Sequence, residues 1–510
     1  MSFLDRFIHF WTGIDMPKFR AYSESYTGGS QTIRSMRNWL PPIGSANTDF
    51  DTVTQQTLVA RCRDAYRNQA LPRAAIDRLK HNVIGPGLRL QARLDYEYLN
   101  LSEEEAGRLE RVIEREFDIW ANTPNCDIER SLNFYAIQTL LLVSMLISGD
   151  VFVNTPFLER KDDLFGFKIQ IIEGDRVSNP SFSPDSTRLI RGIELDSVGS
   201  PVIYHILSAH PGDILSANSW VWEKVPVFSK TGRRRVFHLF EKERPGQIRG
   251  IPYLSPILEY LRQLACYTEA ELTAAVVSGL FAVFVKTEGG LGFPSNTSST
   301  TPPEKKDQLA LKSGMVVNLA PGESIEPANP QRPNTSYDPF VQAILRQIGA
   351  ALGLPIEFLQ LYFASSYSAA RASLLQAWKL ITYYRSLFIY QFCQPIYELW
   401  FDELVARGRI EVKNYTDPRI RAAYTRATWI GPSRGAIDEN KEVDAARSRI
   451  ELGISTLQIE AEELQGQDWL DIHKQRLVEK KKRVEAGLEP KFKQDSEQNI
   501  TKENQDAIFE

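Results

Sequence analysis

One short motif in this chain has the spacing of a hydrolase nucleophile. Residues 431–435, GPSRG, fit the pattern GxSxG, and the strand-like run ATWI at 427–430 precedes them. A serine in such a turn needs an acidic residue and then a histidine from later in the chain. The only later histidine is His473, and Asp471 is too close to it on the same expected helix to orient its ring. We interpret the motif as a turn that leads into a helix, and we keep a soluble serine hydrolase that uses Ser433 as an alternative.

The sequence lacks the patterns of metal and nucleotide chemistry. No GxxxxGK[ST] run is present to hold phosphates, and no HExxH pair is present to bind zinc. The four cysteines, Cys62, Cys126, Cys266 and Cys393, include no CxxC pair, which argues against a clustered zinc site or a disulfide scaffold and suits a reducing compartment. We therefore expect no catalytic residues, no cofactor and no metal.

Two basic clusters could attract a polyanion. Residues 233–235, RRR, precede the strand-like VFHLF, and we interpret them as a charged strand start or subunit contact, with nucleic acid as the alternative. The second cluster lies on the last expected helix. We interpret it as a solvent-exposed helix face, with a face that binds a polyanion as the alternative. Its residues are Lys480, Lys481, Lys482 and Arg483. The net charge of −4 disfavours a monomeric nucleic-acid-binding adaptor, which we keep as a second alternative.

An uncharged run from Ser131 to Gly149 is just long enough to cross a bilayer. It contains six polar side chains, which are costly in lipid, and the strand-like DVFVN follows it. We predict a buried core helix over 131–148 and no membrane span. The N-terminal stretch lacks the features of a signal peptide, so we expect the cytosol or a particle assembled there.

The chain of 510 residues is 43% apolar, enough for several domains with their own cores. Helical periodicity predicts two helices over 54–84 and a third over 101–120, where Ser102 and Glu105 have the spacing of a capping box. Residues 150–245 hold short runs of β-branched and aromatic residues separated by turn formers, so we predict a β-rich unit there.

The second half returns to helical periods. We predict one long helix over 255–283, a loop-rich excursion over 286–337, and a helix that Asp338 caps and that ends at Leu352. An aperiodic segment follows. Ser368 then caps a very long helix to about Arg407 that is kinked near Pro395.

Farther along, the run RIEV at 409–412 resembles a strand. Three short helices are predicted over 438–487, with Asp468 as a cap and Gly453 and Gly487 as stops, before a polar tail.

These landmarks together resemble the lambda-type family of phage portal proteins. The most specific is RPGQxRGxP, followed by LSP and a long helix. Its residues are Arg244, Pro245, Gly246, Gln247, Arg249, Gly250 and Pro252. The others agree in order over about residues 38–470: RCRD at 61–64, SGDVFV at 148–153, IIEGD at 171–175, GIELD at 192–196, LGLP at 352–355 and YSAARA at 367–372.

The resemblance implies an α+β, multi-domain portal fold that forms a ring, with a helical stem, a β-rich wing and clip, a long spine helix and a helical crown. By order along the chain it implies an N-terminal arm at 1–49, the wing at 50–254, stem helices at 255–285 and 338–353, the clip at 286–337, the tunnel loop at 354–368, the spine and wing return at 369–435, the crown at 436–490 and a flexible tail at 491–510.

The resemblance also implies function. Such a protein is a structural part of the virion at one capsid vertex, assembled in the host cytoplasm, and is not an enzyme. Its implied partners are copies of itself (twelve in a typical ring), the large terminase subunit, the major capsid and scaffolding proteins, a head-completion adaptor, and double-stranded DNA that passes without sequence readout. Candidate DNA-facing residues are Tyr362, Phe363, Ser365, Ser366, Tyr367, Ser368 and Arg371, with the basic cluster of the crown.

Overall fold

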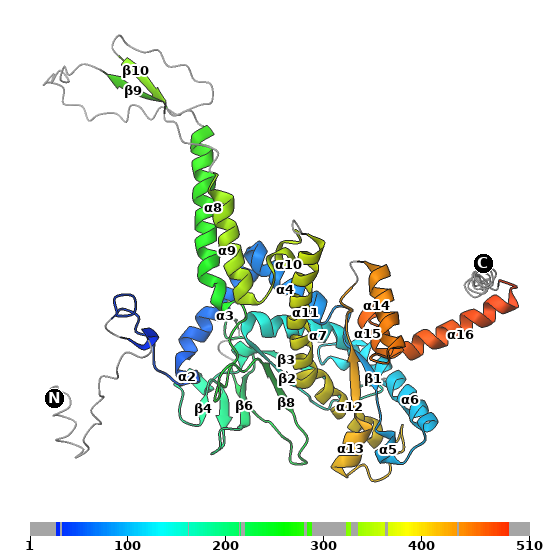
Figure 1. Ribbon diagram of the computed structural model, residues 1–510. Coiled ribbons are helices and arrows are strands. Elements are labelled where there is room, and N and C mark those ends of the chain that lie inside the picture. The colour runs from blue at the N-terminus through cyan, green and yellow to red at the C-terminus, as the bar shows by residue number, and fades with distance from the viewer. Residues whose placement is uncertain are drawn as a thin grey trace, which may run out of the picture.

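The computed structural model describes residues 27–30, 33–161, 163–213, 215, 220–279, 283–287, 323–327, 335–362, 366–435 and 438–488. Figure 1 shows a body of helices and small sheets, from which a pair of helices and one single helix project. No helix in the described ranges is long and apolar enough to span a membrane.

The predicted N-terminal helices are confirmed. They are α3 (Thr52–Asn68), α4 (Ala70–Val83), α6 (Glu103–Ala121) and the apolar α7 (Phe134–Ser148). The Ser102 hydroxyl accepts from the Glu105 backbone N–H and the Glu105 carboxylate accepts from that of Ser102, so the capping box is confirmed too. Short helical segments connect the larger elements: η1 (Thr27–Gly29), α2 (Ala46–Asp49), α5 (Tyr96–Leu99), η2 (Pro124–Cys126), η3 (Gly174–Arg176) and η4 (Pro180–Phe182).

The predicted β-rich unit forms two antiparallel sheets. One has the order β3-β2-β8, with β2 (Asp150–Asn154) between β3 (Gln170–Glu173) and β8 (Val236–Phe240). The other runs β4-β5-β6-β7, from β4 (Leu189–Ile190) and β5 (Ile193–Leu195) to β6 (Pro201–Leu207) and β7 (Trp222–Pro226). Phe152 of β2 and Tyr204 of β6 meet in the small core between these sheets.

The projecting pair consists of α8 (Leu258–Gly279) and α9 (Tyr337–Leu352) (Figure 1). Tyr267 stacks on Tyr337 and contacts Phe340 edge-on, which ties the middle of α8 to the first turn of α9. The prediction for the first of them was too long at both ends. Residues 255–257 form a 3₁₀ turn (η6), and the α-helix ends at Gly279.

A strand rather than more helix follows. The β-branched and aromatic run of β9 (Val283–Thr287) pairs antiparallel with β10 (Glu323–Pro327), because such side chains suit an extended backbone. The start of α9 was also misplaced, since Ser336 and not Asp338 occupies its cap position. Most of the expected clip lies outside the described residues.

The long helix near residue 400 has three parts. They are α11 (Tyr367–Phe388), a π-helical turn η7 (Ile389–Cys393) and α12 (Gln394–Ala406). The break lies just before Pro395, as predicted, because a wider turn accommodates a residue that lacks a backbone N–H. The cap was wrong, since the Ser366 hydroxyl, not that of Ser368, accepts from the backbone of Ala369. The aperiodic segment before it contains a short helix, α10 (Ile356–Gln360).

The π turn places Gln391 against the edge of the β3-β2-β8 sheet. Its side-chain amide nitrogen, Nε2, donates to the carbonyl of Phe240 at 2.8 Å, and its Oε1 accepts from the Phe240 N–H at 3.1 Å. Both backbone groups of the last residue of β8 are therefore bonded by one side chain. The main core lies beside this helix, where the ring of Phe117 contacts Trp400 at 5.0 Å and Phe134 at 5.4 Å.

The C-terminal region contains α13 (Pro418–Tyr424), α14 (Glu439–Glu451), α15 (Leu457–Gln465) and α16 (Trp469–Glu485). The three predicted short helices are confirmed, and the Asp468 carboxylate caps α16 by accepting from Leu470 N–H. The strand expected at 409–412 is wrong. Arg409 instead pairs with Glu116, and the side chain of Ile410 is buried. The ATWI run forms β11 (Ala427–Ile430), which pairs with β1 (Arg89–Ala92).

Candidate functional site

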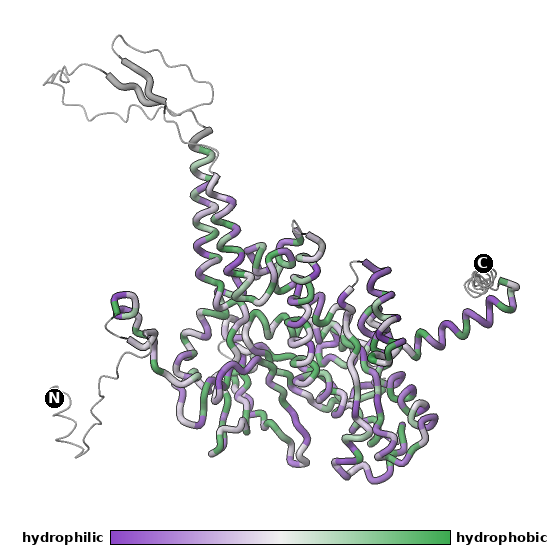
Figure 2. Tube along the Cα trace, viewed as in Figure 1, coloured by the Kyte–Doolittle hydropathy of each residue, from purple (hydrophilic) through white to green (hydrophobic). Residues whose placement is uncertain are grey.

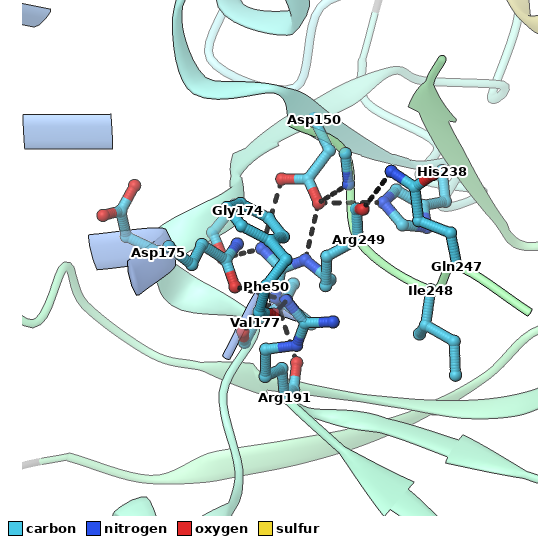
Figure 3. Close-up of polar contacts among 12 residues, drawn as sticks. Phe50, Asp150, Gly174, Asp175, Val177, Arg191, His238, Gln247, Ile248 and Arg249 are labelled. Carbon is cyan, nitrogen blue, oxygen red and sulfur yellow. Dashed lines mark hydrogen bonds and ion pairs between the residues drawn. The ribbon is translucent and has the colours of Figure 1, made fainter. Parts of the chain in front are cut away.

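The RPGQxRGxP motif folds around one buried guanidinium group. Only 2% of the Arg249 side chain is exposed. Its Nε donates to Oδ2 of Asp150 at 2.5 Å and its Nη2 donates to Oδ1 at 3.1 Å, which gives the bidentate geometry of a strong arginine–carboxylate pair (Figure 3). Asp150 begins β2, so the pair joins the motif to the sheet.

The remaining N–H groups of Arg249 meet backbone carbonyls. Nη2 donates to Gly174 at 2.8 Å, and Nη1 donates to Val177 and Arg191 at 3.0 Å each. All five donors of the guanidinium are therefore used within the chain. We call Arg249 and its partners Asp150, Gly174, Val177 and Arg191 the arginine node. Because no donor of Arg249 is left for a ligand, the node holds several segments together and does not bind a substrate.

Two glycines let the segments of the node approach each other. Gly149 has φ of +86°, in the region that favours glycine, and a Cβ there would collide with the carbonyl of Gly250. A Cβ on Gly250 would in turn collide with the carbonyl of Gly149. The SGD and RPGQxRGxP landmarks are therefore the two sides of one close backbone contact.

The charges of the node are arranged for stability and not for proton transfer. Burial opposes ionisation of Asp150, but the charge of Arg249 and the hydrogen bond from His238 outweigh it, so the pKa of that carboxyl lies well below its usual range. Burial lowers the pKa of the His238 imidazole, which is stacked between Phe152 and Phe240. Both groups are almost fully buried, so no substrate reaches them.

The end of the expected N-terminal arm docks on the same motif. Asn47 donates through Nδ2 to the carbonyl of Gly246 at 2.9 Å. Its Oδ1 accepts from the N–H of Ile248 at 3.2 Å and from Arg191 Nη2 at 3.1 Å. Arg244 pairs with Asp49 at 2.5 Å. The motif therefore also receives the segment that precedes α3.

A cleft of about 370 Å³ lies beside the node. Its acidic residues are already paired, Asp150 with Arg249 and Asp175 with Arg63 at 2.5 Å. No cluster of metal-binding side chains occurs in the part of the chain that the structure describes. We therefore assign no acid, base or metal ligand to this cleft.

The hydrolase alternative finds no support in the geometry. The segment that carries Ser433 is held by Arg385, whose Nη2 donates to the carbonyl of Pro432 at 2.8 Å. The ring of His473 stacks on Trp469 on the projecting α16. Among the described residues, no hydrogen bond joins Ser433 to His473. Residues 431–435 follow β11 without regular secondary structure, and α14 begins at Glu439.

Two of the three arginines at 233–235 lie over aromatic rings of the fold. Arg233 lies over the ring of Phe167 at 5.4 Å, and Arg234 lies over that of Phe237 at 4.6 Å. Burial lowers the pKa of both guanidinium groups. These contacts favour the charged strand start over a surface for nucleic acid.

The residues expected in the tunnel loop are only partly described. Phe363 and Ser365 lie outside the described residues. Tyr362 is exposed, Ser366 caps α11, Tyr367 is the first residue of that helix and Ser368 is exposed. In sequence these residues extend from the connection after α10 into the first turn of α11.

Arg371 is part of an ion-pair group. Its Nη2 lies 2.7 Å from Glu442 Oε1, while Arg434 Nη2 lies 2.9 Å from the other oxygen of that carboxylate. Glu442 is mostly buried on α14, so the pair with Arg371 joins α11 to α14. The crown cluster of Lys480, Lys481, Lys482 and Arg483 lies on α16 and is exposed.

Sequence reasoning missed the partners of the node. No motif spacing predicted that Arg249 contacts Asp150, Gly174 and Arg191. The first two of these residues do lie in the landmark segments SGDVFV and IIEGD. The available signal was that glycines and charged residues gather in these landmarks. Which of them meet is decided by strand order and cannot be obtained from one sequence.

Comparison with known proteins identifies the family. Residues 32–385 match the family described as "Phage portal protein, lambda family". This chain belongs to that family, so it is a structural component of the virion and not an enzyme, as the resemblance implied. It is 27% identical to Portal protein B of Escherichia phage lambda, over 93% of this chain and 92% of the relative. It is 26% identical to the Portal protein of Escherichia phage N15, over 92% of each chain.

Among solved structures, two neck assemblies are similar at 11% identity. The neck of a native GTA particle computed with C12 symmetry has a TM-score of 0.40 and covers 80% of this chain and 92% of that chain. The neck of an empty GTA particle computed with C6 symmetry has a TM-score of 0.43, over 78% and 90%.

Proposed function

We propose that twelve copies of this chain close into a ring at one vertex of the capsid, and that double-stranded DNA passes through the central channel during packaging and ejection. One observation carries the proposal: a member of the portal family projects a two-helix stem, α8 and α9, away from its body (Figure 1). Leu272 and Val276 of α8 and Phe340 of α9 are exposed there. Large apolar side chains on a projecting element need neighbours to cover them, and a ring supplies those neighbours.

The charge of the chain suits a channel that does not grip its cargo. Each copy carries a net charge of −4, and a ring repeats that charge around one axis. DNA facing such walls is repelled from all sides over about 10 Å, the screening length at 0.1 M salt. Sparse cations at constrictions then make the few contacts, and they touch phosphates rather than bases.

The segments take the following roles in this proposal. The body from 50 to 254 is the wing, α8 and α9 are the stem, and the excursion at 286–337 is the clip. Residues 354–368 are the tunnel loop, α11 to α12 the spine, and α14 to α16 the crown. The residues facing DNA are Arg371, the cluster at 480–483, and the tunnel-loop residues Tyr362, Phe363, Ser365, Ser366, Tyr367 and Ser368.

The proposed partners follow from this arrangement. The large terminase subunit docks on the ring during packaging, and a head-completion adaptor takes its place afterwards. Major capsid and scaffolding proteins surround the ring in the shell. The proposal requires no base recognition and no membrane.

Electron microscopy and light scattering of the purified full chain test the ring. We expect closed rings with a central hole, and a mass of about twelve times that of the 58.0 kDa chain. A species that stays at the mass of one chain at all concentrations would overturn the proposal.

DNA contact in the crown is tested by changing Lys480, Lys481, Lys482 and Arg483 together to Ala. The expected result is slower packaging and poorer retention of DNA in filled particles, because a ring of cations has been removed. A matched control replaces the exposed Arg447 of α14. Unchanged packaging and retention in rings of normal appearance would contradict the role of this cluster.

A further inference from the structure

The last helix presents an apolar stripe that nothing in its own chain covers. No residue of α16 is buried. Leu470, Leu477 and Val484 are 39%, 54% and 50% exposed and recur every seven residues. A repeat of seven keeps apolar side chains on one side of a helix over several turns, the pattern of a helix that packs on another helix.

Lysines border this stripe. Lys474 lies four residues after Leu470, and Lys481 lies four residues after Leu477, so both are on the flank of the apolar face. Residues 469–488 hold six Lys and Arg against three Asp and Glu. The face therefore fits an apolar surface with an acidic border.

The two preceding helices provide such a surface. Leu452 and Ile454, in the turn between α14 and α15, are 75% and 71% exposed, and Ile459 on α15 is 48% exposed. Glu462 and Glu463 follow Ile459 at three and four residues, on the same side of the helix. Residues 438–468 hold nine carboxylates against three cations, so this region has the opposite charge to α16.

Within one chain the two surfaces do not cover each other. α16 runs away from the body in a straight line (Figure 1), and Figure 2 shows hydrophobic turns along it among hydrophilic ones. Its anchoring is at the base, where Arg93 lies 3.9 Å from the capping residue Asp468. The continuous helix to Glu485 cannot fold back on α14 and α15.

We propose that α16 of one copy lies on α14 and α15 of the next copy, with the Leu470, Leu477 and Val484 stripe on the apolar residues around Ile459. This inference rests on the proposed ring, because a head-to-tail ring needs two different, complementary surfaces on each chain. The stripe and its acidic counterpart are such a pair. The contact locks neighbouring crowns together and leaves Lys482 and Arg483, on the other sides of α16, free of it.

The charge pattern favours this occupant over two others. Pairing α16 with a second α16 would bring two basic helices together, which like-charge repulsion opposes. A nucleic acid alone would match the lysines but not the seven-residue apolar stripe. The test below separates these outcomes.

Cross-linking between differently marked chains tests the contact. The exposed Cys266 is first changed to Ser, since the other three cysteines are buried. One chain then carries Ile459→Cys, a second carries Leu477→Cys, and the two are co-expressed and treated with a short bis-maleimide. We expect a covalent dimer from the mixture and little from either variant alone. A dimer from Leu477→Cys alone would show α16 paired with α16 and would overturn the proposal.

A position on the opposite side of α16 provides the control. Glu479→Cys mixed with Ile459→Cys should give at least a tenfold weaker dimer band than Leu477→Cys does. Electron micrographs of the same samples distinguish a failure of the α16 contact from a failure of ring formation. Rings without the dimer would overturn this inference alone, and a lack of rings would count against the proposed function.

Charge reversal gives an independent check in the full chain. Lys474→Glu with Lys481→Glu should abolish the cross-link between Ile459→Cys and Leu477→Cys chains. Adding Glu462→Lys and Glu463→Lys should restore it. A cross-link that persists unchanged through the first reversal, or that fails to return after the second, would contradict the charge pairing.

Discussion

Asp150 and Arg249 lie 99 residues apart in the chain and form a buried bidentate ion pair, with 2.5 Å between Oδ2 and Nε. Asp150 begins β2, and Arg249 lies a few residues before the first stem helix. The pair therefore ties the segment that leads into α8 to the β-rich unit. The carbonyls of Gly174 and Val177 extend this link to the segment after β3.

Replacing Asp150 with Asn should be strongly destabilising. Breaking a buried pair by removing one charge leaves the other without compensation, at a cost of about 3–5 kcal/mol. Urea unfolding followed by tryptophan fluorescence would measure the loss. Arg244→Met is the control, because its pair with Asp49 is half exposed and should contribute less than about 1 kcal/mol. Equal effects of the two variants would show that the node does not have this structural role.

Glu114 should make stability depend on pH near neutrality. Burial raises the pKa of this carboxyl to about 7, and the negative charges of Asp468 and Glu110 act in the same direction. The hydrogen bond from the Ala92 N–H, at 3.0 Å, and the charge of Arg93 only partly oppose this rise. Since the folded pKa exceeds the ordinary value of 4.5, the folded state holds the proton more tightly. Stability from this group is therefore present at low pH and decreases as pH rises toward and past 7.

The variant Glu114→Gln removes that charge and keeps an acceptor for Ala92. We expect it to raise the free energy of unfolding by about 1–3 kcal/mol at pH 8 and to change it little at pH 4.5. Unfolding curves at several pH values measure this. Glu103→Gln, at the exposed start of the same helix, should change stability by less than about 1 kcal/mol. Parallel pH profiles for the native chain and Glu114→Gln would contradict the prediction.

Loss of the Asn47 side chain should release the arm from the body. Asn47→Ala removes three hydrogen bonds, to Gly246, Ile248 and Arg191, each with a net value of about 1 kcal/mol. Trypsin cleavage after Arg37 should accelerate about tenfold or more, because local opening exposes the chain. Asn68→Ala, which loses only an exposed bond to Asp64, is the matched control. An unchanged cleavage rate would show that the arm is held by other contacts.

The carboxylate of Glu442 should hold α14 to α11. Glu442→Gln leaves Arg371 and Arg434 without their shared anion, with an expected local cost of about 1–3 kcal/mol for these partly exposed arginines. Hydrogen exchange in α14 should become about 10- to 100-fold faster. Lys441→Gln, which breaks an exposed pair with Asp438, should leave it nearly unchanged. Similar hydrogen-exchange rates in α14 of both variants would show that Glu442 does not hold α14 in place.

Local signals in the sequence predicted much of the fold. The capping box at Ser102, the helix that Asp468 caps and the β-rich unit all depend on residues close in sequence, where propensity and pattern act directly. Some errors were local: Ser336 and Ser366, rather than the predicted Asp338 and Ser368, occupy the cap positions of α9 and α11. Another error lies where a distant contact decides. The run at 409–412 has strand-like residues, but in the fold Arg409 pairs with Glu116 of α6.

The candidate site shows the same division. The motif containing Arg249 and the glycines at 149 and 250 could be found as landmarks. The contacts of Arg249 with Asp150 and of Gly149 with Gly250 could not be predicted from the sequence. They depend on strand order and on backbone contacts between segments that are far apart in the chain. The ion pair of Arg371 with Glu442 could not be predicted from the sequence either, because most of α11, α12 and α13 separate the two residues in the chain.

The bonding of Gln391 to Phe240 has a consequence for assembly. An open strand edge is a template for unwanted pairing with other chains, and a protein made in many copies at high local concentration is especially exposed to that hazard. At the end of β8 one amide side chain occupies both backbone groups that a foreign strand would seek. The π turn η7 thus blocks strand addition at this end of β8.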